Sequence, residues 1–219
     1  MQPQIHQHNL REQALAILKT RLISGELAPG EIYSAASLAA ELGVSNSPVR
    51  EAMLTLVNQG LMETVRNRGF RVVPIRRKQL EDIYSVRLML EIPSIRKLAS
   101  IPDQVRKFEP ELRAKLVELR RCSEHDDIIG YLTKDKEFHL QLLGILNNPY
   151  LVSTIENLRD QVRQYGVHGN SARIVLSRSE TEHEGILNAI LAGNPTDAEK
   201  LMTSHIYNFI KDFDGGVAV

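Results

Sequence analysis

The 219-residue sequence predicts a mostly α-helical protein in two parts: an N-terminal part that ends in a small β-hairpin, and a C-terminal antiparallel bundle of helices. Apolar residues recur at helical spacing along most of the chain, which predicts amphipathic helices. Short β-prone runs flank a turn at residues 66–69, and no strand-like alternation follows residue 77. The segment Pro-Ile-Arg-Arg at residues 74–77 is typical of a linker between the two parts.

The first predicted helix spans residues 10–24 and should end at Gly25. Five apolar residues of this helix should face inward: Leu10, Ala14, Ile17, Leu18 and Leu22. A turn around Pro29-Gly30 follows, and Ser34 is a good N-cap for the next helix. The polar start of the chain, which contains His6 and His8, is expected to be disordered.

Two short helices joined by a tight turn are predicted within residues 38–57. Their apolar faces are Leu38, Ala39 and Leu42 in the first, and Val49, Ala52, Met53, Leu56 and Val57 in the second. Gly43 suits the left-handed position that ends a helix. Ser45 or Ser47 can cap the second helix, and Pro48 is tolerated in its first turn. This arrangement is a helix-turn-helix.

The second of these helices carries Asn46, Ser47 and Arg50 near its start, on the polar side. In helix-turn-helix proteins this end of the helix meets base edges in the major groove. Arginine can bind guanine and asparagine can bind adenine, and both can also bind phosphates. A solvated helix face is the alternative interpretation.

A basic hairpin after the helix-turn-helix favours DNA binding. The β-prone runs at residues 64–65 and 70–73 flank Arg66-Asn67-Arg68-Gly69, which predicts a winged helix-turn-helix with a small β-hairpin wing. Residues 1–77 carry nine Lys/Arg and six Asp/Glu, a balance of +3, so the remaining eighteen and twenty-one give −3. The predicted DNA-binding residues are Ser34, Ser45, Asn46, Ser47, Arg50, Arg66, Arg68 and Gly69.

The composition excludes several classes of protein. No run of eighteen apolar residues occurs, so no membrane span is predicted, and the start lacks the pattern of an export signal. The single Cys122 excludes an internal disulfide framework and fits a reducing compartment, so we expect a cytoplasmic protein. Gly-x-Ser-x-Gly, a phosphate-binding glycine loop and a nucleophilic cysteine signature are all missing from the sequence.

The C-terminal part predicts an all-α antiparallel bundle. Its periodic segments are approximately residues 78–100, 104–121, 125–147, 149–167, 171–192 and 195–213. Proline, glycine and acidic residues separate these segments. Pro93 lies inside the first segment and should kink or split it. The Lys/Arg-rich residues 106–121 are expected to form a solvated face, and His125 and His168 are expected in loops.

Asp135 and His139 are four residues apart, so both should project from one face of a helix. Phe138, Leu142 and Leu143 lie close to that face, which should bury the pair at least partly. His183 and His205 also border apolar stripes in later helices. A metal ion satisfies such a buried pair well, but core or surface histidines with hydrogen-bond partners remain the alternative.

Motifs in the first third resemble the DNA-binding domain of the GntR family of bacterial transcription regulators. The most specific are the Pro29-Gly30 pair, LAAELGVS, PVREA at Pro48–Ala52 and NRGF at Asn67–Phe70, within a resemblance that covers residues 10–73. Asn46 stands where such proteins usually carry arginine, so the operator sequence cannot be taken from relatives. The segments DKEFHLQLL, NNPYL and EHEGILNAILAGNPTDAEKLMTSH resemble the all-helical FCD ligand-binding domain of the FadR branch, over residues 78–213.

This resemblance implies a metal site. In many FCD domains an Asp, a His four residues later and two further His bind a divalent ion that helps hold a carboxylate effector. The matching residues are Asp135, His139, His183 and His205, a ligand set that suits Zn²⁺ or Ni²⁺. Arg87 matches a recurrent arginine of the domain and could pair with an effector carboxylate, although an ion pair with Glu91 is the alternative.

Together these features predict a transcription regulator, and more specifically a repressor, rather than an enzyme. Residues 1–75 would form the DNA-binding domain, and residues 76–219 would bind metal and effector and form a homodimer. Such a dimer would bind a near-palindromic operator in double-stranded DNA. A metalloenzyme and a regulator with a purely structural metal are the alternatives.

Overall fold

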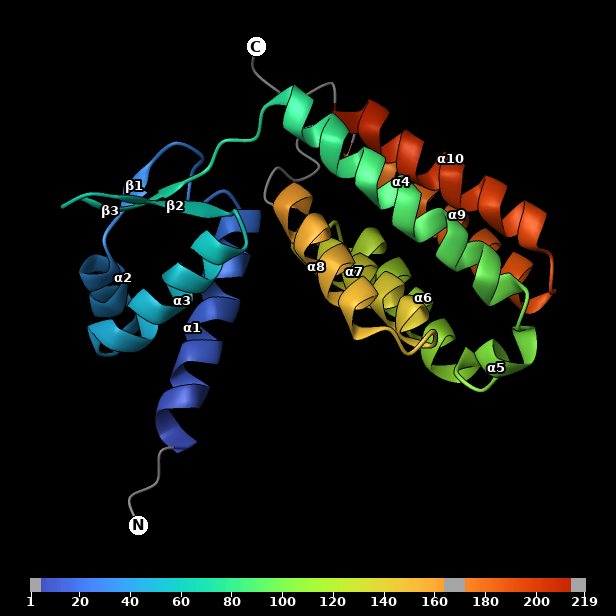
Figure 1. The fold of residues 1–219 in the computed structure, drawn as a ribbon, viewed down its shortest axis with the longest axis horizontal. Helices are drawn as coiled ribbons and strands as arrows, with labels where there is room; N and C mark the ends of the chain where they lie inside the picture. The colour runs from blue at the N-terminus through green and yellow to red at the C-terminus, as the bar shows by residue number, and fades with distance from the viewer. Residues whose placement is uncertain (1–4, 164–171, 214–219) are drawn as a thin grey trace. The chain divides into compact units, whose positions relative to one another are not determined.

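The computed structural model describes the backbone of residues 5–163 and 172–213, and side chains within residues 10–162 and 176–208 (Figure 1). These residues form two compact units, the first ending at Arg76 and the second beginning at Arg77. The protein is mostly helical, with an N-terminal helix-turn-helix, a small antiparallel sheet and a C-terminal helical unit, as the sequence predicts. Among the described residues, no helix is both long and apolar enough to cross a membrane.

The N-terminal unit contains three helices and three short strands. Its elements are α1 (Ile5–Ile23), β1 (Ile32–Tyr33), α2 (Ala35–Leu42), α3 (Asn46–Asn58), β2 (Met62–Val65) and β3 (Gly69–Val72). The sheet is antiparallel with the order β1-β3-β2, and the register of the hairpin pairs Val65 with Gly69 and Met62 with Val72. The predicted helix-turn-helix and hairpin are confirmed.

Helix α1 differs from the prediction in its first residue and in which of its apolar side chains are buried. It begins at Ile5, so the predicted disorder is wrong for the backbone of residues 5–9; no proline or glycine interrupts residues 5–23. The side chains of His6 and His8 lie outside the described residues. Ala14, Leu18 and Leu22 are buried as predicted, whereas Leu10 and Ile17 are 37% and 40% exposed.

Helix geometry explains these two errors. Ala14, Leu18 and Leu22 form one row of residues four apart that packs against α3, and Ile17 lies about 100° around the helix from Leu18. Leu10 continues that row toward the start of α1, where the helix extends past α2 and α3 (Figure 1).

Helices α2 and α3 begin and end where their caps require. The Ser34 Oγ accepts a hydrogen bond from the Ser37 N–H at 3.0 Å, and Gly43 ends α2 in the left-handed conformation at φ 66°. Ser45 occupies the N-cap position of α3 without a side-chain capping bond, and Pro48 lies in the first turn. In α3 Val49, Ala52, Met53 and Leu56 are completely buried and Val57 is partly buried against them, which confirms the predicted stripe.

Strand β1 is not foreseen in the sequence. It is two residues long, so it carries no alternation, and it pairs with β3 at Ile32–Arg71 and Tyr33–Phe70. Two further backbone bonds hold it: the Gly30 N–H donates to the Val72 carbonyl at 2.9 Å, and the Val72 N–H donates to the Glu31 carbonyl at 3.0 Å. The predicted turn at residues 26–31 therefore leads into a third strand.

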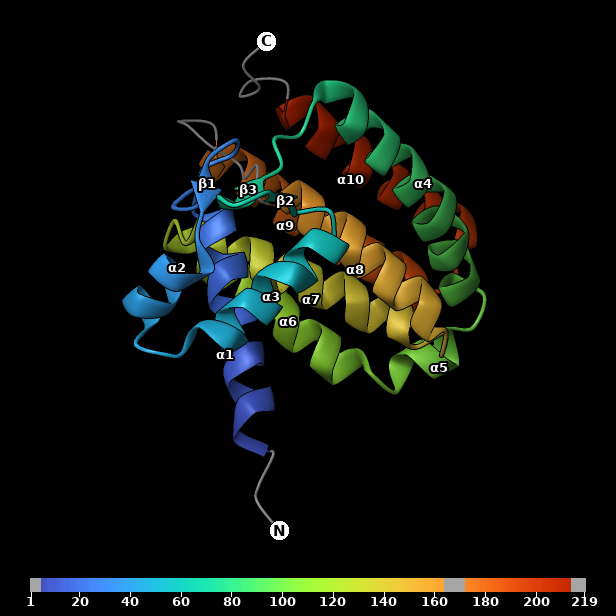
Figure 2. The same ribbon diagram turned by 60° about the vertical axis from the view of Figure 1, so that its left-hand side comes forward.

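The C-terminal unit contains seven helices within the described residues. They are α4 (Arg77–Ala99), α5 (Pro102–Arg106), α6 (Glu109–Glu124), α7 (Ile128–Gly144), α8 (Pro149–Arg163), α9 (Ala172–Leu191) and α10 (Pro195–Phe213). Helix α10 packs against α4 and α9, and α6 packs against α7 and α9 (Figures 1 and 2). The ends predicted at residues 167 and 171 lie outside the described residues.

Two predicted segments need correction. The segment at 104–121 is divided between α5 and α6, because Pro110 has no N–H to donate to the Arg106 carbonyl and its ring would clash there. Pro93 does not split α4, which runs unbroken from Arg77 to Ala99. Buried residues before and after the exposed Pro93, such as Glu91 and Ile95, hold both halves in the same core.

Candidate nucleic-acid interface and metal centre

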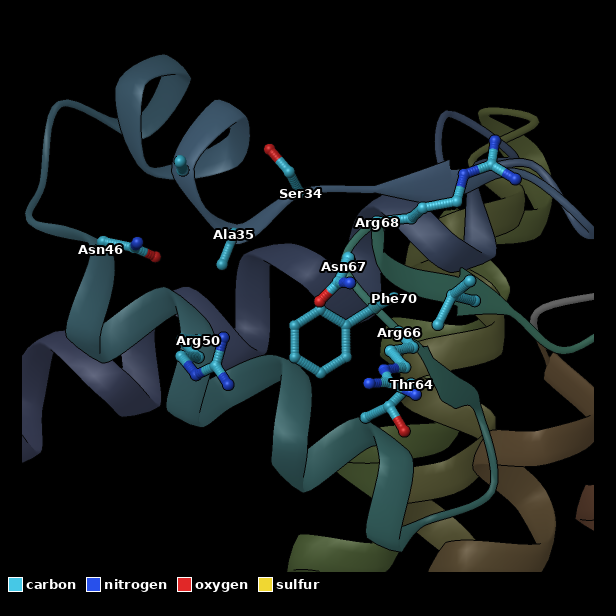
Figure 3. Close-up of a pocket in the computed structure, with 12 residues that line it drawn as sticks. Ser34, Ala35, Asn46, Arg50, Thr64, Arg66, Asn67, Arg68 and Phe70 are labelled. Atoms are coloured by element: carbon cyan, nitrogen blue, oxygen red, sulfur yellow. The ribbon is translucent and has the colours of Figure 1, made fainter.

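One face of the N-terminal unit is hollowed between the helix-turn-helix and the wing. The hollow of about 620 Å³ is lined by Ser34, Ala35, Ala36, Asn46, Arg50, Thr64, Val65, Arg66, Asn67, Arg68, Gly69 and Phe70. Figure 3 shows Asn46 and Arg50 projecting from α3 on one side and Arg66 and Arg68 from the wing on the other, with the Phe70 ring between them. Polar and cationic groups from three elements thus face one concave surface.

The start of α3 presents polar groups to solvent. Asn46, Ser47 and Arg50 are exposed, as predicted. The Ser47 hydroxyl donates to the Glu51 carboxylate at 3.1 Å, so this hydroxyl is already engaged. Within the described residues, Arg50 makes no ion pair, so its guanidinium is available to an anion or a base.

The wing is a tight turn held close to β1. Asn67 and Gly69 have positive φ values of 58° and 126°. A Cβ on residue 69 would lie 2.4 Å from the Tyr33 carbonyl oxygen, so only glycine allows this approach. Arg71 pairs with Glu63 across the hairpin at 2.8 Å, whereas no described residue pairs with Arg66 or Arg68.

The structure places six of the eight predicted DNA-binding residues around this hollow. Ser34, Asn46, Arg50, Arg66, Arg68 and Gly69 line it, while Ser45 and Ser47 lie beside it at the start of α3. The sequence prediction omitted Thr64, Asn67 and Phe70. The position of Asn67 in the predicted turn was a usable signal, because asparagine tolerates the left-handed conformation. Whether these residues touch DNA stays a prediction.

The second site is a cluster of four side chains from three helices of the C-terminal unit. Asp135 and His139 come from α7, His183 from α9 and His205 from α10. One ligand atom from each lies within 4.8 Å of the others, and all four residues are buried or nearly so. The sequence placed Asp135 and His139 on one face; the fold brings the other two histidines to it.

Distances within the cluster are short. The Nε2 atoms of His139 and His183 are 3.0 Å apart, and the His183 Nε2 lies 2.9 Å from the Asp135 Oδ1. The His139 Nε2 lies 3.6 Å from the same oxygen. The ring centroids of His183 and His205 are 4.5 Å apart. The nitrogen lone pairs and one carboxylate oxygen therefore converge on a small volume.

The outer partners of the histidines differ. The His205 Nδ1 lies 2.8 Å from the Glu182 carboxylate, so the ring donates there and turns its Nε2 toward the cluster. The His183 Nδ1 is buried without a hydrogen-bond partner among the described residues. Phe138 packs edge-on against the rings of His139 and His183 and excludes water from one side.

The protonation states suit metal ligands. Burial, together with the nearby Arg159, lowers the pKa of His139 well below its usual value, and burial beside His183 lowers the pKa of His205. Burial alone would raise the pKa of Asp135, but His139, His183 and Arg159 outweigh it and hold that pKa well below its usual range. At neutral pH these two imidazoles are neutral and the carboxylate is ionised, as metal binding requires.

The donor set fits a divalent ion. Three imidazoles and a carboxylate with converging lone pairs are a common ligand set for transition metals. Hydrogen bonds within the cluster satisfy this set only in part, because the His183 Nε2 carries at most one hydrogen and cannot donate to both the His139 Nε2 and the Asp135 Oδ1. The cluster could therefore hold a metal ion.

A network of buried charges adjoins the cluster. The Arg87 Nε donates to the Glu91 Oε1 at 2.7 Å, so the predicted ion pair with Glu91 forms. The second Glu91 oxygen accepts from Arg159 on α8 at 2.6 Å, and Arg159 also donates to the Asp135 Oδ2 at 3.0 Å. The sequence prediction missed Arg159, although its spacing from the buried Ile155 and Val162 places it on the inner face of α8.

Neither His125 nor Cys122, which were also named from the sequence, belongs to the hollow or to the cluster. The His125 Nδ1 lies 2.8 Å from the Arg121 carbonyl oxygen at the end of α6. Cys122 is partly exposed, and burial raises the pKa of its thiol. His168 lies outside the described residues.

Two protein families match the chain. Residues 10–72 match the family of bacterial regulatory proteins called gntR, and residues 82–208 match the FCD domain. The chain is 31% identical over 143 residues to the Nta operon transcriptional regulator of Aminobacter aminovorans, across 64% of this chain and 66% of that protein. It is 27% identical over 208 residues to the gluconate operon transcriptional repressor of Bacillus licheniformis, across 91% of this chain and 82% of that protein.

The fold has a solved counterpart. The Escherichia coli protein McbR/YncC superposes with a TM-score of 0.78 at 24% identity, covering 94% of this chain and 97% of that chain. The matching families are transcription regulators rather than enzymes. The chain belongs to the GntR family of bacterial transcription regulators, in the FadR subfamily that carries a C-terminal FCD domain.

Proposed function

We propose that this regulator is a repressor whose affinity for its operator is controlled by a small carboxylate bound at a metal ion in the helical unit. The observation that carries the proposal is the buried cluster of one aspartate and three histidines. The chain has a DNA-binding unit and its sequence carries no catalytic signature, so we infer that the cluster binds a ligand that regulates DNA binding. The repressor named among the relatives supports the direction of control.

The DNA-binding part of the proposal rests on the hollow in the N-terminal unit. Arg50 at the start of α3 would contact a base, and Asn46 would contact a base or a phosphate. Arg66 and Arg68 on the wing would bind the DNA backbone. Ser34, Ser45, Ser47 and Gly69 would complete the contact surface through hydroxyls and backbone groups close to phosphates.

The effector part rests on charge. Asp135, His139, His183 and His205 would hold Zn²⁺ or Ni²⁺, which when bound would supply a Lewis-acidic position for an anionic oxygen. The nearby buried charges, Arg87 and Arg159 against Glu91 and Asp135, already balance. A divalent ion would add an excess of positive charge there, which favours an anionic ligand. Arg87 would be a second contact for the carboxylate of that ligand.

The two parts would act together in a homodimer. Residues 1–75 would bind one half-site of a near-palindromic operator, and residues 76–219 would bind metal and effector and join two chains. Effector binding would favour one of two arrangements of the helical domains, and these would space the DNA-binding domains differently.

The test measures DNA binding by the full chain. An operator is first selected from random duplex DNA, and its affinity is followed by fluorescence anisotropy with and without Zn²⁺ and a panel of small carboxylates. We expect one carboxylate to change the affinity by roughly 5- to 150-fold, only in metal-loaded protein, while NMR shows that it is not consumed. If metal-depleted protein responds equally, the metal is structural; if no carboxylate acts, the effector proposal is wrong.

A further inference from the structure

A buried arginine joins one member of the metal cluster to a different helix. Arg159 on α8 donates from its Nη1 to the Asp135 Oδ2 on α7, and from its Nη2 to the Glu91 Oε2 on α4. Arg159 is 3% exposed, and Glu91 is completely buried. Both charge-assisted hydrogen bonds therefore form away from water, where they are strongest and most directional.

The two oxygens of Asp135 have separate partners. The Oδ1 faces the histidine cluster, 2.9 Å from the His183 Nε2, while the Oδ2 is held by Arg159 at 3.0 Å. A carboxylate whose second oxygen is bound by arginine has a fixed plane and offers an ion one oxygen. Arg159 thus determines how Asp135 faces the cluster.

Glu91 extends this contact to α4. Its Oε1 accepts from the Arg87 Nε at 2.7 Å, so Arg87, Glu91, Arg159 and Asp135 form a chain of alternating charges across α4, α8 and α7. Helix α4 begins at Arg77, directly after the segment that leaves the N-terminal unit. A displacement of Asp135 would therefore act, through Arg159, on a hydrogen bond that Glu91 accepts on this helix.

Arg159 donates to two carboxylates on different helices, which indicates that it orients these carboxylates as well as neutralising their charge. A guanidinium that only neutralised one carboxylate could bind it with two parallel bonds. Here the fork is shared between carboxylates on two helices, and the Arg159 Nε is buried without a partner among the described residues. A lysine ammonium, a compact charge on a flexible stem, cannot hold both carboxylates in this planar arrangement.

We propose that Arg159 is the positioning residue of the metal centre: it holds the Asp135 carboxylate so that a single oxygen faces the ion, and it links the state of the centre to α4 through Glu91. This inference rests on the proposed function, because it requires that the cluster bind metal. It adds a residue and a route by which binding at the cluster reaches α4, the helix that follows the DNA-binding unit in the chain.

The test uses Co²⁺ as the probe in the full-length Arg159→Lys variant, which keeps the charge. We expect Co²⁺ affinity to fall by roughly 10- to 100-fold, as for other residues that orient metal ligands. The visible absorption spectrum of the bound Co²⁺ should change, because Asp135 is free to rotate and to offer both oxygens. Arg21→Lys is the matched control: Arg21 also divides its guanidinium between two carboxylates, those of Glu26 and Glu41, but it belongs to the N-terminal unit and should leave both readouts unchanged.

The link to α4 is measured by hydrogen exchange. In the unmodified chain, saturating Co²⁺ should slow amide exchange in α4 as well as in the ligand helices α7, α9 and α10. In Arg159→Lys at saturating Co²⁺, the ligand helices should keep this protection and α4 should lose it. At saturating Co²⁺, Glu91→Gln should likewise keep the protection of the ligand helices and lose that of α4, because it removes the charge on α4 that Arg159 binds.

The outcomes separate this inference from the proposed function. If the unmodified chain binds Co²⁺ and Arg159→Lys shows the same affinity, spectrum and α4 protection, the inference is wrong and the proposed function stands. If the unmodified chain binds neither Co²⁺ nor Zn²⁺, both are wrong. If circular dichroism shows that Arg159→Lys does not fold, Glu91→Gln decides: unaltered α4 protection in that variant overturns the link.

Discussion

Arg50 is the residue on which the specificity of DNA recognition should depend most. It is exposed in the first turns of α3, lines the hollow and pairs with no described acidic residue. Arg50→Ala should weaken binding to the selected operator by about 1–3 kcal/mol and relax the preference at one base position. Binding curves against operator variants measure both effects. Arg96→Ala, an exposed arginine of the other unit, is the control; equal behaviour of the two variants would contradict the assignment.

Gly69 serves the fold of the wing as well as the contact surface. A methyl group at this position would clash with the Tyr33 carbonyl, and φ is 126°. Gly69→Ala should therefore lower the free energy of unfolding by more than the roughly 1–2 kcal/mol of left-handed strain alone. Gly30→Ala is the comparison: Gly30 has a φ of 86° but open space around its Cα, so alanine there would strain the backbone without a steric clash. Urea unfolding of the two variants should rank them in this order, and equal destabilisation would exclude the clash.

At the scale of elements, the wing and α3 should contribute different kinds of binding energy. Arg66→Ala and Arg68→Ala should weaken binding to selected and random DNA alike, because phosphate contacts carry no sequence information. Removal of one phosphate contact should flatten the dependence of log affinity on log salt by about one unit. Affinity measured across a salt series tests this.

The same hairpin provides the control for the wing. Arg71→Ala removes an arginine that is already paired with Glu63 across the strands, so the salt dependence should change little. An unchanged salt slope in Arg66→Ala and Arg68→Ala would show that the wing does not approach the DNA backbone.

At the scale of the whole molecule, one ion would join three helices of the bundle. Chelation should lower the melting temperature of the purified protein, and Zn²⁺ or Ni²⁺ should restore it, because a ligand that binds only the folded state stabilises it. His183→Ala should remove most of this response, since His183 is completely buried in the cluster. His125→Ala, at the end of α6, should keep it. A melting temperature that chelator does not change would favour the alternative that these histidines are ordinary core residues without a metal.

Acid should destabilise the metal-free protein through the same residues. The pKa values of His139 and His205 are lowered by burial, so the folded state binds fewer protons than the unfolded state below about pH 6.5. The free energy of unfolding should therefore fall as the pH drops through about 6.5 toward the lower pKa values of the folded state. Urea unfolding on either side of this pH measures the effect; an unchanged free energy would mean that these rings remain solvated.

Much of the architecture could be predicted because it follows from local spacing. The stripe through Val49, Met53 and Leu56, the stop at Gly43 and the hairpin around residues 66–69 are properties of short segments, and backbone geometry decides them within one or two turns. The same rule placed Asp135 and His139 on one helix face. For these features the sequence was sufficient.

Tertiary structure decided what depends on contacts between distant segments. The two-residue β1 exists because β3 lies beside it, and Leu10 and Ile17 are exposed because of where α3 packs. His183 and His205 reach Asp135 only through the packing of α9 and α10, and the roles of Arg159 and Glu182 appear only there. The physical reason is that helical periodicity fixes which side of a helix is apolar, whereas which side chains meet across helices depends on how the chain folds back on itself.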